Sequence, residues 1–85
     1  MLKNFTTLDM ELSGKKLYAA IKKSGYSVRE LQEKLFLSCP NPIYRWIHGS
    51  ALPSIDNLYR LSRILDTPME ELLAVKQVDL EEGLY

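Results

Sequence analysis

Four polar side chains in one short segment could hydrogen-bond with nucleic acid: Asn41, Tyr44, Arg45 and His48. At about 100° per residue of a helix, they fall on one face or at its edge, while Ile43, Trp46 and Ile47 cluster on the opposite side. An amide, a phenol, a guanidinium and an imidazole are groups that bind base edges and phosphates in the major groove of DNA. The pattern therefore predicts that residues 40–48 form a DNA-recognition helix.

Arg45 is the central candidate on this face, because a guanidinium can bind guanine O6 and N7 with two hydrogen bonds. A surface arginine without a role is the alternative. Asn41 could pair with adenine N6 and N7, or its amide could instead help to cap the helix. Tyr44 and His48 suit phosphates or thymine methyl groups better than catalysis, and Trp46 lies toward the apolar side, where packing is expected.

The sequence does not indicate enzymatic chemistry. His48 is the one histidine of the chain and has no acid or nucleophile paired with it. The lone Cys39 cannot form an intramolecular disulfide and lacks the partners of a zinc site. Since a glycine-rich phosphate loop is also absent from the sequence, we expect a non-enzyme without a cofactor or a metal.

Two short amphipathic segments form a predicted helix-turn-helix. Ser27 is an N-cap, and Glu30 stands three residues later as its capping-box partner. Leu31 and Leu35 lie on the apolar face of the helix that begins at Ser27. Gly49 supplies the left-handed stop of the second, recognition helix.

The run L-x-x-x-L at positions 31–35, then P-N-P-I-Y-R-W-I-H-G, then L-P-S-I-D-N-L resembles the XRE family of phage-repressor and Cro-type DNA-binding domains. The resemblance extends over residues 14–73 and implies an all-α, five-helix, lambda-repressor-like fold. It also implies that Ser50, in the loop after the recognition helix, is a candidate phosphate ligand; a plain helix connector is the alternative. Phe36 stands where the family usually has a turn glycine, and Ile47 where it often has glutamate.

The other helices have capping signals of their own. Ser13 is the predicted N-cap of a first helix, and Ser54 is that of a fourth. Thr67 and Pro68 begin a short fifth helix, which includes Val75.

The start of the helix at Ser27 and Val28 offers N–H groups and a positive dipole end, which suit a phosphate. Pro40 is tolerated in the first turn of the recognition helix, where N–H groups lack intrahelical partners. The candidate DNA-binding residues are therefore Ser27, Val28, Pro40, Asn41, Tyr44, Arg45, His48 and Ser50.

Size and charge agree with this interpretation. With 85 residues, 46% of them hydrophobic, the chain can form one small domain. Its formal net charge is zero, but residues 1–63 carry ten Lys or Arg against five Asp or Glu, whereas residues 64–85 carry one against six. A basic body of +5 and an acidic end of −5 are compatible with one face on DNA and the other turned away.

We expect three regions. Residues 1–12 form an N-terminal arm, either a short extended segment that could pair with its copy in a dimer or a disordered one. Residues 13–75 form the helix-turn-helix domain, and residues 76–85 form an acidic tail that packs on a partner subunit or is disordered. Because no stretch has the apolar length of a membrane span and the N-terminus lacks a signal pattern, a cytoplasmic location is expected.

The predicted function is that of a sequence-specific transcriptional regulator that binds double-stranded DNA as a homodimer. Its two recognition helices would lie about 34 Å apart on a pseudo-palindromic site. The alternative is a protein-interaction module with the same fold, such as an antitoxin-like protein or a regulator subunit, whose acidic C-terminal part holds a protein partner. A strong salt dependence of DNA binding would distinguish the two.

Overall fold

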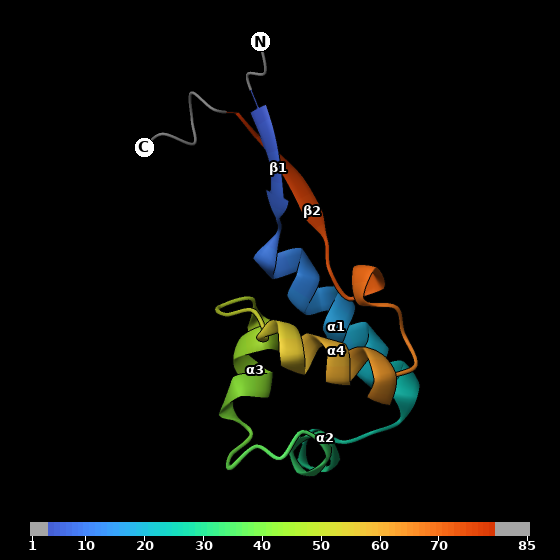
Figure 1. Cartoon of the computed structure of the whole chain (residues 1–85). Helices are drawn as coiled ribbons and strands as arrows, with labels where there is room; N and C mark the ends of the chain where they lie inside the picture. The colour runs from blue at the N-terminus through green and yellow to red at the C-terminus, as the bar shows by residue number, and fades with distance from the viewer. Residues whose placement is uncertain (1–3, 80–85) are drawn as a thin grey trace.

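The computed structural model describes residues 4–79, which form a helical body and a two-stranded sheet that projects from it (Figure 1). The α-helices of this part of the chain are α1 (Met10–Ser24), α2 (Val28–Lys34), α3 (Asn41–His48) and α4 (Ile55–Ile64). A 3-10 helix, η1 (Met69–Glu71), follows α4. The strands are β1 (Asn4–Leu8) and β2 (Val75–Asp79).

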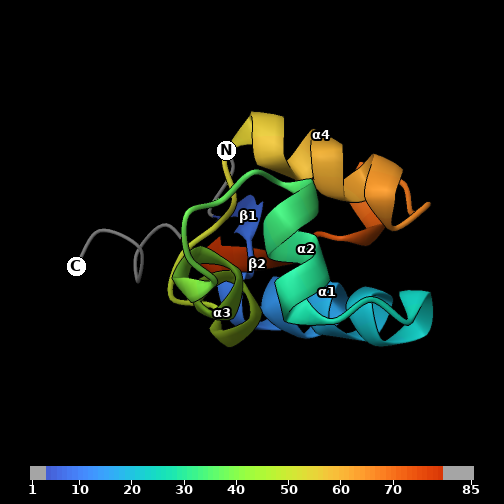
Figure 2. The same ribbon diagram turned by 90° about the horizontal axis from the view of Figure 1, so that it is seen from below.

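The core lies where the helices meet, and four large side chains are fully buried there: Leu31, Leu35, Ile43 and Leu61. In Figure 1 α2 lies below α1 and α4, so that it crosses in front of them when the molecule is seen from below, with α3 to one side (Figure 2). The apolar stripes that helical periodicity predicts on α2, α3 and α4 all reach this core. The helix-turn-helix is therefore held through the apolar faces of α2 and α3, which pack into one core with α1 and α4.

Local capping signals place the predicted helices correctly at several ends. Ser27 and Glu30 form the expected capping box, since the Ser27 Oγ accepts the Glu30 N–H and the Glu30 Oε1 accepts the Ser27 N–H, each at 3.1 Å. Ser54 caps α4 by accepting the N–H of Asn57 at 3.1 Å. Gly49 ends α3 in the left-handed region, at φ +77°.

The predicted start of the first helix is wrong. The N-cap of α1 is Asp9, whose carboxylate accepts the Leu12 N–H at 2.9 Å. Ser13 instead lies inside α1, is buried, and pairs with the backbone of Ala74: its hydroxyl accepts the Ala74 N–H at 2.8 Å and donates to the Ala74 carbonyl at 3.3 Å. Ser13 thus joins the two ends of the domain.

The predicted fifth α-helix is also wrong, because only the short 3-10 helix η1 forms after Pro68. The contacts of Ala74 explain why the helix does not continue. Its carbonyl accepts the Asp9 N–H at 2.8 Å as well as the Ser13 hydroxyl, which draws the chain into an extended course alongside α1. Val75 then begins β2, so the all-α, five-helix description is corrected to four α-helices and a small sheet within residues 4–79.

Residues 4–8 of the predicted N-terminal arm form a strand whose partner is a segment of the same chain, whereas residues 10–12 belong to α1, so the predicted end of the arm at residue 12 is wrong. β1 and β2 pair antiparallel, with Phe5 opposite Val78 and Thr7 opposite Lys76. The first part of the predicted acidic tail therefore belongs to the sheet, whereas residues 80–85, like residues 1–3 of the arm, lie outside the described residues. Within residues 4–79, no helix is both long and apolar enough to cross a membrane.

Candidate nucleic-acid interface

The outer face of α3 presents polar side chains to solvent while the inner face enters the core. Ile43 and Trp46 are buried, and the latter is only 6% exposed, which confirms that the tryptophan packs in the core. The exposed side chains of the helix are those of Asn41, Tyr44, Arg45 and His48. Their spacing of three and four residues brings all four together on one face of α3.

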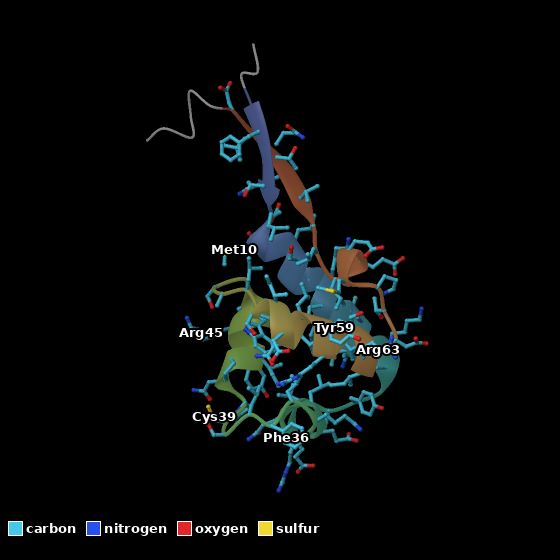
Figure 3. All side chains as sticks on the ribbon, in the orientation of Figure 1. Met10, Phe36, Cys39, Arg45, Tyr59 and Arg63 are labelled. Atoms are coloured by element: carbon cyan, nitrogen blue, oxygen red, sulfur yellow. The ribbon has the colours of Figure 1, made fainter. Side chains whose placement is uncertain are left out.

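Arg45 occupies the middle of this face and points away from the helical body (Figure 3). Among residues 4–79, ion pairs at helical i,i+4 spacing join Lys15 to Glu11, Arg29 to Glu33 and Arg60 to Asp56, and none of them involves Arg45. The guanidinium is therefore available to an external acceptor. Five donors in a planar fork suit bidentate binding to guanine or to a phosphate.

The start of α3 leaves the amide of Asn41 available. The N-cap is Pro40, without a side-chain cap, and its carbonyl accepts the Ile43 N–H at 3.0 Å. Within the described residues, the Asn41 side chain has no hydrogen-bond partner, and capping of the helix by its amide, the alternative role, does not occur. Donor and acceptor atoms of this amide are thus free for a base edge.

The turn between α2 and α3 holds Phe36 in the left-handed region, at φ +56°. The Phe36 N–H donates to the carbonyl of Glu33 at 3.2 Å, and the next N–H, of Leu37, donates to that of Gln32 at 3.0 Å. These two bonds form the helix-ending arrangement in which glycine is usual. Phe36 therefore adopts the same backbone conformation as a turn glycine, at a cost in strain, and its side chain is 89% exposed.

The start of α2 is occupied by its own capping box. The Glu30 carboxylate interacts with Ser27, chiefly by accepting the Ser27 N–H, and this holds the pKa of the Glu30 carboxyl below its ordinary value. A phosphate that approached Ser27 would meet this carboxylate. Val28 is partly buried against the core, so its side chain packs and only its backbone N–H could serve as a ligand.

Ser50 follows α3 and also has an intramolecular partner. Its hydroxyl donates to the Arg45 carbonyl at 3.2 Å, and its N–H donates to the same oxygen at 3.0 Å. The side chain thereby helps to end α3 by bonding to the carbonyl of Arg45. A phosphate would have to compete for the proton of this hydroxyl.

Gly14 positions α3, a role that the sequence analysis does not assign to it. A β-carbon on Gly14 would lie 2.7 Å from the Trp46 carbonyl oxygen and closer still to that of Ile47. Only glycine permits α1 and α3 to approach this closely. An isolated glycine within a helical pattern is the sequence signal that could have revealed this contact.

Residues 14–78 match a family model described as a helix-turn-helix domain. No curated protein matches the chain. The matched range begins at the glycine that packs against α3 and ends within β2, so it includes every residue of the α3 face.

Proposed function

The chain belongs to the helix-turn-helix domain family, in the XRE/Cro-type class, and from this we propose that it is a sequence-specific transcriptional regulator. It places α3 in the major groove of double-stranded DNA and acts by binding rather than by catalysis. Membership of the family indicates a DNA-binding regulator in general; the choice of site and the regulatory role are our proposal.

One observation carries the proposal: α3 has a buried apolar face and an opposite face on which Asn41, Tyr44, Arg45 and His48 are all exposed. A helix fits into the major groove, where each base pair presents its own pattern of donors and acceptors. Such a face combines groups for base edges with groups for phosphates. No packing role explains these four exposed side chains.

The roles follow from chemistry and position. Arg45 binds guanine O6 and N7, and Asn41, one turn earlier, binds adenine N6 and N7. Tyr44 and His48 contact phosphates or thymine methyl groups at the edge of the face. Pro40 and Ser50 flank α3 and approach the DNA backbone, as does the Val28 N–H at the start of α2. We assign no DNA contact to Ser27, because its N–H and its hydroxyl are both bonded to Glu30.

The regulator binds as a homodimer on a two-fold site. Two recognition helices about 34 Å apart would contact successive major grooves on one side of the duplex. A domain of 85 residues gives one recognition helix, and two copies double the number of base contacts. Each good base contact contributes about 1–3 kcal/mol of discrimination.

The exposed Phe36 favours a second candidate function, a protein-interaction module of the same fold. An aromatic side chain that is 89% exposed at the turn offers an apolar anchor for another protein. Glu70 and Glu71 at η1 are exposed and supply negative charge for a basic partner. In this case the module would act as an antitoxin-like protein or as a regulator subunit.

Binding of the purified chain to a randomised DNA duplex pool at two salt concentrations tests the proposal. We expect enrichment of a two-fold sequence, and an affinity that falls as salt rises because phosphate contacts release counterions. Failure to enrich any sequence, with weak binding at both salt concentrations, would overturn the regulator and leave the protein-interaction module.

A further inference from the structure

The strand β1 has one edge that no strand of residues 4–79 covers. β1 pairs with β2 along its other edge, and these two strands are the whole sheet in this part of the chain. A two-stranded antiparallel sheet is only marginally stable by itself, and an open edge presents unpaired N–H and C=O groups to another chain. The open edge of β1 is thus able to accept a further strand.

The composition of β1 favours such pairing. Its sequence, NFTTL, contains no charged residue and no proline, and Phe5, Thr6 and Thr7 are types that favour strands. Natural edge strands are usually protected by charged side chains or proline. β2 carries this protection, as Lys76 and Asp79, and β1 does not.

We propose that a second copy of this chain pairs with the open edge of β1. The strands run antiparallel about a two-fold axis at Thr6, so that Thr6 faces Thr6 of the second copy. This register pairs every residue of β1, with Phe5 opposite Thr7 and Asn4 opposite Leu8 of the other copy. A four-stranded sheet in the order β2, β1, β1, β2 results.

The occupant is a second copy because β1 is compatible with itself. Antiparallel self-pairing brings no like charges together, since the strand has none, and it places threonine against threonine, a favourable cross-strand pair. Phe5 is 42% exposed in one copy, and Thr7 of the second copy would cover part of its open side. Three or more strands are also what independent stability of a sheet requires.

The shape of the molecule permits this assembly. The sheet projects from one end of the helical body (Figure 1). Antiparallel pairing at β1 therefore sets the two bodies at opposite ends of the four-stranded sheet, where they do not collide. This inference deepens the proposed function, because it names the surface that joins the homodimer, but its test requires no DNA.

Cross-linking at the two-fold axis tests the register. In a Cys39→Ser background, which removes the one native thiol, Thr6→Cys should form a disulfide between two copies under mild oxidation. The matched control is Gln77→Cys, which lies opposite Thr6 on β2 but three strand spacings, about 14 Å, from its counterpart in the dimer. Equal cross-linking of the two variants, or none of Thr6→Cys, overturns the proposal.

Sedimentation without DNA provides a second measurement. The wild type should have twice the 9.8 kDa mass of one chain. Thr6→Lys, which sets two ammonium groups face to face, should have the mass of a monomer with an unchanged helical circular dichroism spectrum, while Gln77→Lys should remain a dimer. A monomeric wild type, or a Thr6→Lys dimer as stable as that of Gln77→Lys, contradicts pairing through β1, whatever the result of the DNA experiment.

Discussion

Gly14 of α1 lies directly against the Trp46 carbonyl oxygen of α3, so that a β-carbon on Gly14 would be only 2.7 Å from this oxygen. Heavy atoms do not approach this closely without a shift of one of them. The neighbour is helix backbone rather than the end of a flexible side chain, so it cannot move aside alone. This contact fixes the distance of α3 from the rest of the domain.

Gly14→Ala should therefore destabilise the domain by about 1–3 kcal/mol, the usual range for overpacking. Helix propensity alone would predict the opposite sign, a gain of about 1 kcal/mol. Urea unfolding followed by circular dichroism measures the difference. Ala19→Gly, at an exposed position of α1, is the control and should cost about 1 kcal/mol from propensity. If Gly14→Ala were as stable as the wild type or more stable, α1 and α3 could not approach each other this closely.

Ser13→Ala should destabilise the domain by about 1–3 kcal/mol, because the buried N–H of Ala74 loses its acceptor. Amide hydrogen exchange adds a local measurement: the Ala74 amide should exchange faster in the variant. Ser54→Ala is the control. Loss of this N-cap should lower the free energy of unfolding by about 1 kcal/mol and leave the Ala74 amide protected from exchange. Unchanged exchange at Ala74 in Ser13→Ala would contradict the tie between α1 and the segment before β2.

Phe36→Gly should stabilise the domain by up to about 1 kcal/mol, because glycine adopts φ +56° without the strain of a β-carbon. Little packing is lost, since the Phe36 side chain is 89% exposed. Phe36→Ala keeps the β-carbon and should show no comparable gain. The thermal midpoints of the three proteins provide the test, and a lower midpoint for Phe36→Gly than for Phe36→Ala would refute a strained turn.

The stability that the Glu30 carboxylate contributes should depend on pH. Because its interaction with Ser27 lowers the pKa of Glu30 in the folded protein, this contribution is present above the ordinary value of 4.5 and is lost as pH falls through the lower folded value. Wild type should therefore exceed Glu30→Gln in unfolding free energy at neutral pH, and the difference should shrink in acid. A difference that stays constant with pH is incompatible with this capping box.

Local sequence signals predict the elements that carry the α3 face. The Ser27 and Glu30 capping box and the Gly49 stop depend on residues within a few positions of each other, and helical spacing alone predicts which face of α3 carries Trp46. The short range of these interactions is the reason that the pattern alone suffices. The sequence also shows that Phe36 replaces the usual turn glycine, although the strain that this causes is known only from the φ angle of Phe36 in the structure.

Contacts between residues far apart in the chain cannot be predicted from such local patterns. Ser13 looks like an N-cap in sequence, but its partner Ala74 lies 61 residues away, and no local pattern specifies such a pair. β1 and β2 come from opposite ends of the chain, and no local pattern in either segment specifies the other as its partner. The end of the predicted fifth helix depends on the same distant contacts.

The most direct test of the account is the base preference of Arg45→Ala, measured on the site that the wild type selects. Arg63→Ala is the matched control, because it removes an exposed arginine from another part of the helical body (Figure 3). We predict that Arg45→Ala loses discrimination at one base pair in each half-site, by about 1–3 kcal/mol, while Arg63→Ala keeps the wild-type preference. If Arg45→Ala keeps the preference at every base pair, or loses affinity no more than Arg63→Ala does, α3 does not read DNA through Arg45 and the central claim fails.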